Sequence, residues 1–163
     1  LQPCCGSCNK RKSAQDLPYS LYYEDGEPHP SPLHFAISPQ DVIAFQTKGK
    51  CRGIKAYLCD DEKPGQSVVA KKDGTLAERF NFIFDIDKIY AEHDDEVEEL
   101  LWRNRIYTKG IVDAANQQFA DLDIEGFDFD RYILGTYAKK DEALKRPLTV
   151  MKQDVWEQIM KVE

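Results

Sequence analysis

Two cysteines separated by two residues stand near the start of the chain, where Cys5-Gly6-Ser7-Cys8 is followed by Asn9 and the basic triplet Lys10-Arg11-Lys12. Two thiolates at this spacing can bind one zinc ion, because the turn between them brings both sulfurs to the same side. A tetrahedral zinc site needs four ligands, so this pair supplies half of one. No other segment of the sequence concentrates as much chemistry.

The opening string resembles the closing segment of an HNH endonuclease of the ββα-metal type. In that family the second cysteine pair of a zinc knuckle runs directly into the metal-binding helix, with the pattern Leu-Gln-x-x-Cys-x-x-Cys-(Asn/His)-x-x-Lys. The resemblance is confined to residues 1–16. The residues that match the pattern are Leu1, Gln2, Cys5, Cys8, Asn9 and Lys12.

The resemblance implies a role for each of these residues. Cys5 and Cys8 would be ligands of a structural zinc ion, and Asn9 would be a catalytic residue that binds the catalytic divalent metal. Lys10, Arg11 and Lys12 would face the phosphates of a nucleic acid, and analogy with the family makes DNA the expected one. A neutral amide oxygen suits a hard ion, so the expected cofactors are structural Zn and catalytic Mg or Mn.

The same resemblance sets an expectation about the extent of the chain. The catalytic histidine, the middle asparagine and the first Cys-x-x-Cys of the family all lie upstream of the matched string. We therefore expect the sequence to be the C-terminal part of a longer polypeptide, because the residues given contain no general base for phosphodiester hydrolysis. Residues 1–17 would be the remnant of the ββα-metal motif, and residues 18–163 would form an acidic body.

Other interpretations of the cysteines stay open. Cys5 and Cys8 can instead be a redox dithiol or incidental cysteines, although a redox pair usually opens a helix after a strand. Cys4 is expected to be a small buried residue. Cys51 and Cys59 lie in strand-like runs and are expected to be buried thiols. A less favoured alternative joins them to Cys5 and Cys8 in one zinc site.

Charge is divided unevenly along the sequence. Residues 1–16 carry three of the 22 basic and one of the 29 acidic side chains, which leaves 19 basic and 28 acidic ones, net −9, in the rest of the chain. A body that acidic repels a phosphate backbone. We therefore expect nucleic acid to contact the N-terminal basic segment and a partner protein to contact the acidic body.

Composition bounds the class of protein. With 163 residues, of which 42% are apolar, the chain can bury one core. It contains no apolar run long enough to span a membrane and no signal-peptide pattern at its start. Three of the five cysteines form one tight cluster and the other two are single residues. This arrangement fits a reducing compartment, so a cytoplasmic location is expected.

The predicted fold class is α+β, in which a short metal-knuckle and helix remnant precedes a small antiparallel sheet packed with C-terminal helices. Strands are expected mostly within residues 19–86, at 19–23, 33–37, 52–59 and 67–71, with a turn at 63–65. Alternating Phe80, Phe82 and Phe84 also favour a strand, although residues 76–84 can form a helix.

Helices are expected mostly within residues 92–162. Ser38 and Pro39 begin a short helix through Phe45 that Gly49 ends, and Lys10 to Asp16 forms another after the knuckle. Apolar residues from Asp94 to Phe119 follow a helical repeat over about seven turns, with Gly110 allowing a bend or a close contact. Residues 129–138 and 149–162 complete the set.

Two further clusters have ordinary explanations. The acids after His93 fit the start of a helix better than a metal site. Lys139, Lys140, Lys145 and Arg146 form a loose basic patch that is expected to be solvated surface, with a secondary nucleic-acid contact as the alternative.

Two functions therefore remain. The first is the C-terminal part of a metal-dependent HNH endonuclease in a restriction or antiphage setting. The second is a non-catalytic, zinc-stabilised module that binds protein.

Overall fold

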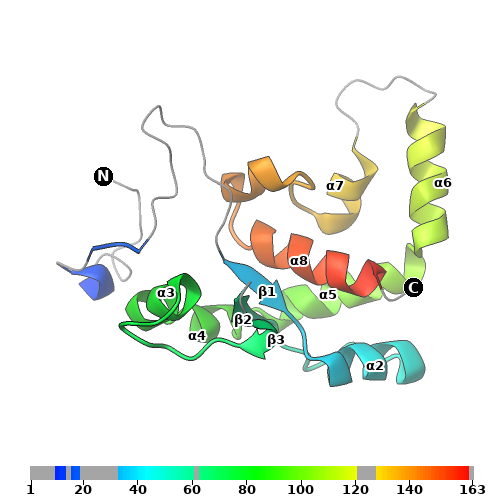
Figure 1. The fold of residues 1–163 in the computed structure, drawn as a ribbon. Helices are drawn as coiled ribbons and strands as arrows, with labels where there is room; N and C mark the ends of the chain where they lie inside the picture. Colours follow the sequence, from blue (N-terminus) through cyan, green and yellow to red (C-terminus); the bar gives the residue numbers. More distant parts are fainter. Residues whose placement is uncertain (1–9, 14–15, 19–32, 61–62, 121–127, 162–163) are drawn as a thin grey trace.

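The computed structural model describes residues 10–13, 16–18, 33–60, 63–120 and 128–161 (Figure 1). This part of the chain has an α+β fold in which helices surround a small sheet. The strands are β1 (His34–Ala36), β2 (Tyr57–Asp60) and β3 (Lys63–Ser67). The helices are α2 (Pro39–Lys48), α3 (Leu76–Phe84), α4 (Ile86–Tyr90), α5 (Asp94–Ile106), α6 (Lys109–Ala120), α7 (Phe129–Leu134), a 3-10 helix η1 (Lys140–Lys145) and α8 (Thr149–Met160).

The sheet is antiparallel with the order β1-β2-β3. Phe35 of β1 lies opposite Leu58 of β2, and both side chains are buried. Helix α8 runs beside β1 and also packs on α5, so the core lies between the sheet and these two helices (Figure 1). Side chains that are less than 2% exposed include Ile37, Ile54, Leu58, Val97, Leu100, Leu101, Ile133, Met151, Val155 and Ile159.

Helix α2 begins where the sequence predicts and is ended by the predicted glycine. The Ser38 hydroxyl accepts a hydrogen bond from the Asp41 N–H, and Pro39 occupies the first turn. Gly49 ends the helix in the left-handed conformation with φ of 67°. The helix runs to Lys48, three residues beyond the predicted end at Phe45.

The strand prediction for Phe80, Phe82 and Phe84 is wrong, because these residues lie in α3. Thr75 and Glu78 form a capping box that starts a helix at Leu76. Phe80 is buried and stacks on Phe84, four residues later, with ring centroids 5.9 Å apart, whereas Phe82 is 46% exposed. Phe80 and Phe84 therefore share one face of a helix, and α3 occupies residues expected to form a strand.

The strand boundaries also differ from the prediction. Residues 52–56 do not pair, because Gly53 turns the chain with φ of 69° and β2 begins only at Tyr57. The predicted turn at residues 63–65 is the start of β3, which tolerates Pro64 because it is an edge strand. Residues 68–71, predicted as strand, are irregular. The predicted strand at residues 19–23 lies outside the described residues.

The single long helix predicted from Asp94 to Phe119 is two helices. The chain leaves helical geometry at Tyr107, with φ of −103° and ψ of 70°, and the Thr108 carbonyl then accepts hydrogen bonds from the first turn of α6. The Tyr107 ring packs edge-on against Phe129, 5.8 Å between centroids. This contact lies at the break, and α6 points away from the axis of α5 (Figure 1).

Two other predicted helices are shorter than expected, and the last one agrees closely. The helix after the knuckle is helical at residues 10–12 but not at Asp16, since Ser13 adopts a left-handed φ of 49°. Helix α7 stops at Leu134, because Gly135 is left-handed. Helix α8 ends at Met160 and buries Val155, Trp156 and Ile159 on one side as predicted.

None of the helices in the described residues combines the length and apolar character that crossing a bilayer requires.

Candidate nucleic-acid interface

The predicted basic triplet lies on one helical turn beside the body of the protein. Arg11 contacts the C-terminal end of α3, where its Nη1 donates a hydrogen bond to the Phe84 carbonyl at 2.9 Å and lies 3.3 Å from Asp85 Oδ2. A guanidinium is favoured there because the last carbonyls of a helix carry partial negative charge. Arg11 therefore ties the N-terminal segment to α3.

Lys10 and Lys12 differ from Arg11 in their contacts. Lys10 is exposed and Lys12 is half-buried, and neither has an ion pair with another residue in the described ranges. Their ammonium groups are therefore available to an anionic ligand, in keeping with the prediction that this segment faces phosphate.

Two more cations lie in a hollow that the N-terminal segment reaches through Asp16, and the sequence analysis did not connect them with that segment. Lys72 and Arg79 line an open hollow of about 440 Å³ together with Asp16, Asp73, Gly74, Phe82 and Ile83. Both cations are exposed. A helical interpretation of residues 76–84 would have put Arg79 and Phe82 on one face and so suggested this surface.

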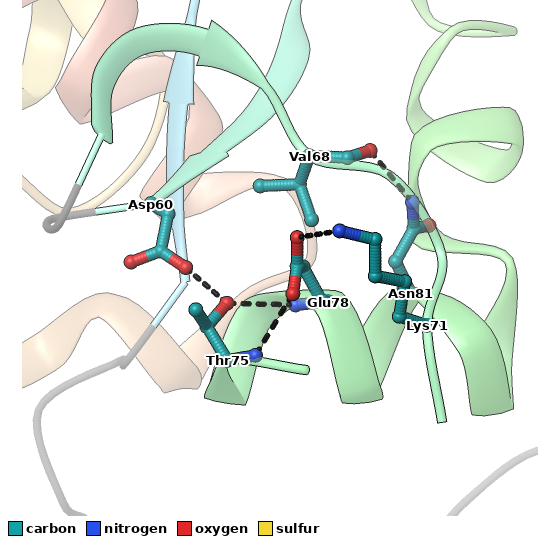
Figure 2. Close-up of polar contacts among 6 residues, drawn as sticks. All are labelled: Asp60, Val68, Lys71, Thr75, Glu78 and Asn81. Carbon is teal, nitrogen blue, oxygen red and sulfur yellow. Dashed lines mark hydrogen bonds and ion pairs between the residues drawn. The ribbon is translucent and has the colours of Figure 1, made fainter. Parts of the chain in front are cut away.

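A network of polar contacts fixes the first two turns of α3 (Figure 2). The Thr75 N–H donates to Glu78 Oε2 at 2.9 Å, and the Thr75 hydroxyl also contacts the Asp60 carboxylate at the end of β2. Lys71 lies 3.3 Å from Glu78 Oε1, and the Asn81 amide donates to the Val68 carbonyl at 3.3 Å. These contacts join β2, residues 68–71 and the first two turns of α3 into one unit.

Asp87 continues this network at the other end of α3. Its carboxylate accepts hydrogen bonds from the Leu58 N–H at 2.7 Å and from the Asn81 amide at 2.9 Å. Burial raises the pKa of the Asp87 carboxyl, and the two hydrogen bonds oppose that shift. Asp87 thereby attaches α4 to β2.

Cys5, Cys8 and Asn9 lie outside the described residues. Within the described part of the chain, no group of three or more His, Cys, Asp or Glu side chains is arranged to hold a metal ion. The donor chemistry of the predicted ligands fits the predicted ions, since two thiolates suit zinc and an amide oxygen suits magnesium or manganese.

The other cysteines and the candidate acids have structural positions. Cys51 and Cys59 are buried, as predicted, at 5% and 8% exposure. Burial raises the pKa of the Cys51 thiol, and Arg105 opposes that shift. Asp94 and Asp95 lie in the first turn of α5, where the helix dipole favours them.

His34 has an acidic neighbour in space that lies far from it in the sequence. His34 Nδ1 lies 3.5 Å from Asp154 Oδ2, and the same oxygen accepts a hydrogen bond from the Phe35 N–H at 3.0 Å. The two residues are 120 positions apart, so only the fold brings them together. The contact joins β1 to α8.

Comparisons with models of protein families, with curated proteins and with solved structures gave no match.

Proposed function

We propose that this chain is the C-terminal part of a metal-dependent HNH endonuclease that hydrolyses phosphodiester bonds of nucleic acid, in a restriction or antiphage setting in the cytoplasm. The observation that carries the proposal is the spacing of Cys5, Cys8, Asn9 and Lys12. It is supported by the helical turn at residues 10–12, since the family's cysteine pair runs directly into a helix.

In this proposal the two metals have separate roles. Cys5 and Cys8 are two of the ligands of a structural zinc ion, which contributes to the folding of the N-terminal segment. Asn9 offers its amide oxygen to magnesium or manganese, which when bound stabilises negative charge on the scissile phosphate and the leaving oxygen. The histidine that activates water belongs to the part of the motif upstream of Leu1.

The cations of the interface bind and orient the substrate. Lys10 and Lys12 contact phosphate directly, and Lys72 and Arg79 extend the contact across the hollow beside α3. Arg11 is engaged with Phe84 and Asp85, so we assign it the positioning of this segment. The acidic remainder of the body is the surface for a partner protein.

The decisive experiment is DNA cleavage by the complete gene product in magnesium. Asn9→Ala should reduce cleavage by about a hundredfold or more, because a metal ligand is lost, while the zinc content and the thermal unfolding midpoint stay unchanged. Gln46→Ala, at an exposed amide on α2, is the control and should retain full activity. Unchanged cleavage by the Asn9 variant would refute the assignment.

A second measurement separates the nuclease from the zinc-stabilised interaction module. Cys5→Ser should release zinc measured by elemental analysis, because a thiolate ligand is lost. A protein that binds zinc but cuts neither DNA nor RNA with magnesium or manganese would favour the interaction module. A complete protein without zinc would contradict both functions.

A further inference from the structure

Residues 129–146 form a segment of net positive charge within an acidic body. They hold five basic side chains, Arg131, Lys139, Lys140, Lys145 and Arg146, against the three acidic side chains Asp130, Asp141 and Glu142. The segment comprises α7, the turn after it and η1, and it packs on α8 (Figure 1). Its net charge is opposite in sign to that of the rest of the body.

The fold gathers three of these cations around one aromatic ring. Measured to the centroid of the Tyr137 ring, the Arg131 guanidinium carbon lies at 4.3 Å, Lys145 Nζ at 5.2 Å and the Arg146 guanidinium carbon at 5.9 Å. Each contact is within the range of a cation–π interaction. Arg131 and Arg146 come from opposite sides of Gly135 in the sequence, so this cluster exists only in the folded chain.

The positive charge of the cluster is only partly neutralised. Lys145 pairs with Glu142 at 2.5 Å, whereas Arg131 and Arg146 have no ion pair with any residue in the described ranges. The Lys145 hydrogen bond chiefly lowers the pKa of Glu142, and Lys139 and Arg131 lower it further. Three like charges around one ring repel one another, and a bound anion removes that repulsion.

The arginines over the Tyr137 ring can bind phosphates, and an exposed aromatic ring nearby can stack on a base, so the surface suits a single nucleic-acid strand. A guanidinium that lies over a ring keeps its N–H groups directed outward, where they can bind a phosphate in a bidentate manner. Tyr132 follows Arg131 in α7 and is 65% exposed, although its ring stacks on Phe129 with the centroids 6.1 Å apart, so much of the ring stays open to a base.

We propose that Arg131, Arg146, Tyr132 and Tyr137 form a second nucleic-acid site, which binds the phosphate backbone and the bases of a single strand. This site is separate from the N-terminal basic segment and does not depend on a metal at Asn9. Among the described exposed side chains of the segment, Tyr132 is the large apolar one, so the surface lacks the aliphatic anchors of a membrane-binding patch.

The test is equilibrium binding of the complete protein to a fluorescent thymidine oligonucleotide of about 16 nucleotides, in buffer without added magnesium or manganese, so that cleavage does not contribute and the structural zinc stays bound. The double variant Arg131→Gln with Arg146→Gln should bind about tenfold or more weakly. The slope of log K against log salt should become shallower by about 1.4, because two phosphate contacts are lost.

Matched variants separate this site from general charge effects. Lys48→Gln with Lys55→Gln removes the same charge from exposed positions outside the segment and should bind like the unaltered protein. Arg131→Lys with Arg146→Lys should keep the salt slope but weaken binding, since it keeps charge without the planar fork. Tyr132→Phe should retain affinity and Tyr132→Ala should lose it.

Two results would overturn the proposal. One is equal oligonucleotide affinity for the Arg131→Gln, Arg146→Gln variant and the Lys48→Gln, Lys55→Gln control. The other is an unchanged oligonucleotide affinity accompanied by lost binding to phosphatidylserine vesicles, which would assign the patch to a membrane surface. Because the assay contains no added magnesium or manganese, its failure is distinguishable from failure of the nuclease proposal, which is measured by cleavage.

Discussion

Gln158 on α8 binds both polar groups of the Ile37 backbone, accepting from the Ile37 N–H at 2.9 Å and donating to the Ile37 carbonyl at 3.0 Å. Asp154, one turn earlier, accepts from the Phe35 N–H at 3.0 Å. These side chains take the place of a further strand at the open edge of β1. They satisfy backbone groups that would otherwise be buried without partners, and they prevent another chain from pairing there.

The first prediction concerns this edge. Gln158→Leu should lower the free energy of unfolding by about 2–4 kcal/mol, because Ile37 is fully buried and both of its backbone groups lose their partner. Gln158→Glu should cost less, since it keeps the acceptor for the Ile37 N–H. Urea denaturation measures both, with Gln46→Leu on exposed α2 as the control. Equal stability of the Leu variant and its control would contradict this role.

The second prediction concerns the attachment of the N-terminal segment. Arg11→Ala should increase hydrogen exchange in peptides that cover residues 10–18, because the contacts with Phe84 and Asp85 are lost. Asp85→Asn should have a smaller effect, since the Phe84 hydrogen bond remains. Global stability should change by less than about 1 kcal/mol in both, as expected for an exposed pair. Exchange that is unchanged in Arg11→Ala would show that other contacts hold the segment.

The third prediction follows from the ion pair between Lys50 and Asp41, 2.7 Å apart. The Lys50 ammonium lowers the pKa of Asp41 below its ordinary value of 3.8, so the pair stabilises the folded state above that pH. The contribution is lost as pH falls through the lowered pKa. Lys50→Gln should therefore reduce the free energy of unfolding by about 0.5 kcal/mol at neutral pH and leave it unchanged near pH 2.

Urea titrations at both pH values measure this difference. Lys55→Gln removes an equally exposed ammonium that has no ion pair within the described residues, so it should not reproduce the pH dependence. A loss of stability in Lys50→Gln that is equal at both pH values would exclude Asp41 as the cause.

The elements that the sequence predicts well are those whose signals are local. Both ends of α2 follow from Ser38 and Gly49, because each acts through its own backbone neighbourhood. The alternating phenylalanines of α3 led to a strand prediction, although an equally local signal, the capping box of Thr75 and Glu78, indicates a helix start. The break between α5 and α6 lies where Tyr107 packs against Phe129, 22 residues later, and a periodic pattern within the helix carries no sign of that contact.

The functional residues divide in the same way. The spacing of Cys5, Cys8 and Asn9 is visible in the sequence because these residues are adjacent in the chain. Lys72 and Arg79 line a hollow with Asp16 of the N-terminal segment, and only the folded chain brings these residues together. Arg131 was absent from the predicted basic patch, because Gly135 must reverse the chain before its guanidinium reaches Tyr137.

The last prediction tests the expectation that Gly110 permits a bend or a close contact. Gly110 lies in the first turn of α6 with no positive φ, and a Cβ added there would meet no atom within 4 Å. Gly110→Ala should therefore raise the free energy of unfolding by about 0.5 kcal/mol, because alanine loses less backbone entropy in a helix.

Gly49→Ala provides the opposite case. Gly49 has φ of 67°, and a Cβ there would collide with the Arg105 guanidinium, so this variant should lose about 1 kcal/mol or more. Thermal and urea unfolding of the two variants should move in opposite directions. Destabilisation by Gly110→Ala would mean that the break after Tyr107 needs the glycine, and that the helix restart at Lys109 depends on backbone freedom as well as on the packing of Tyr107.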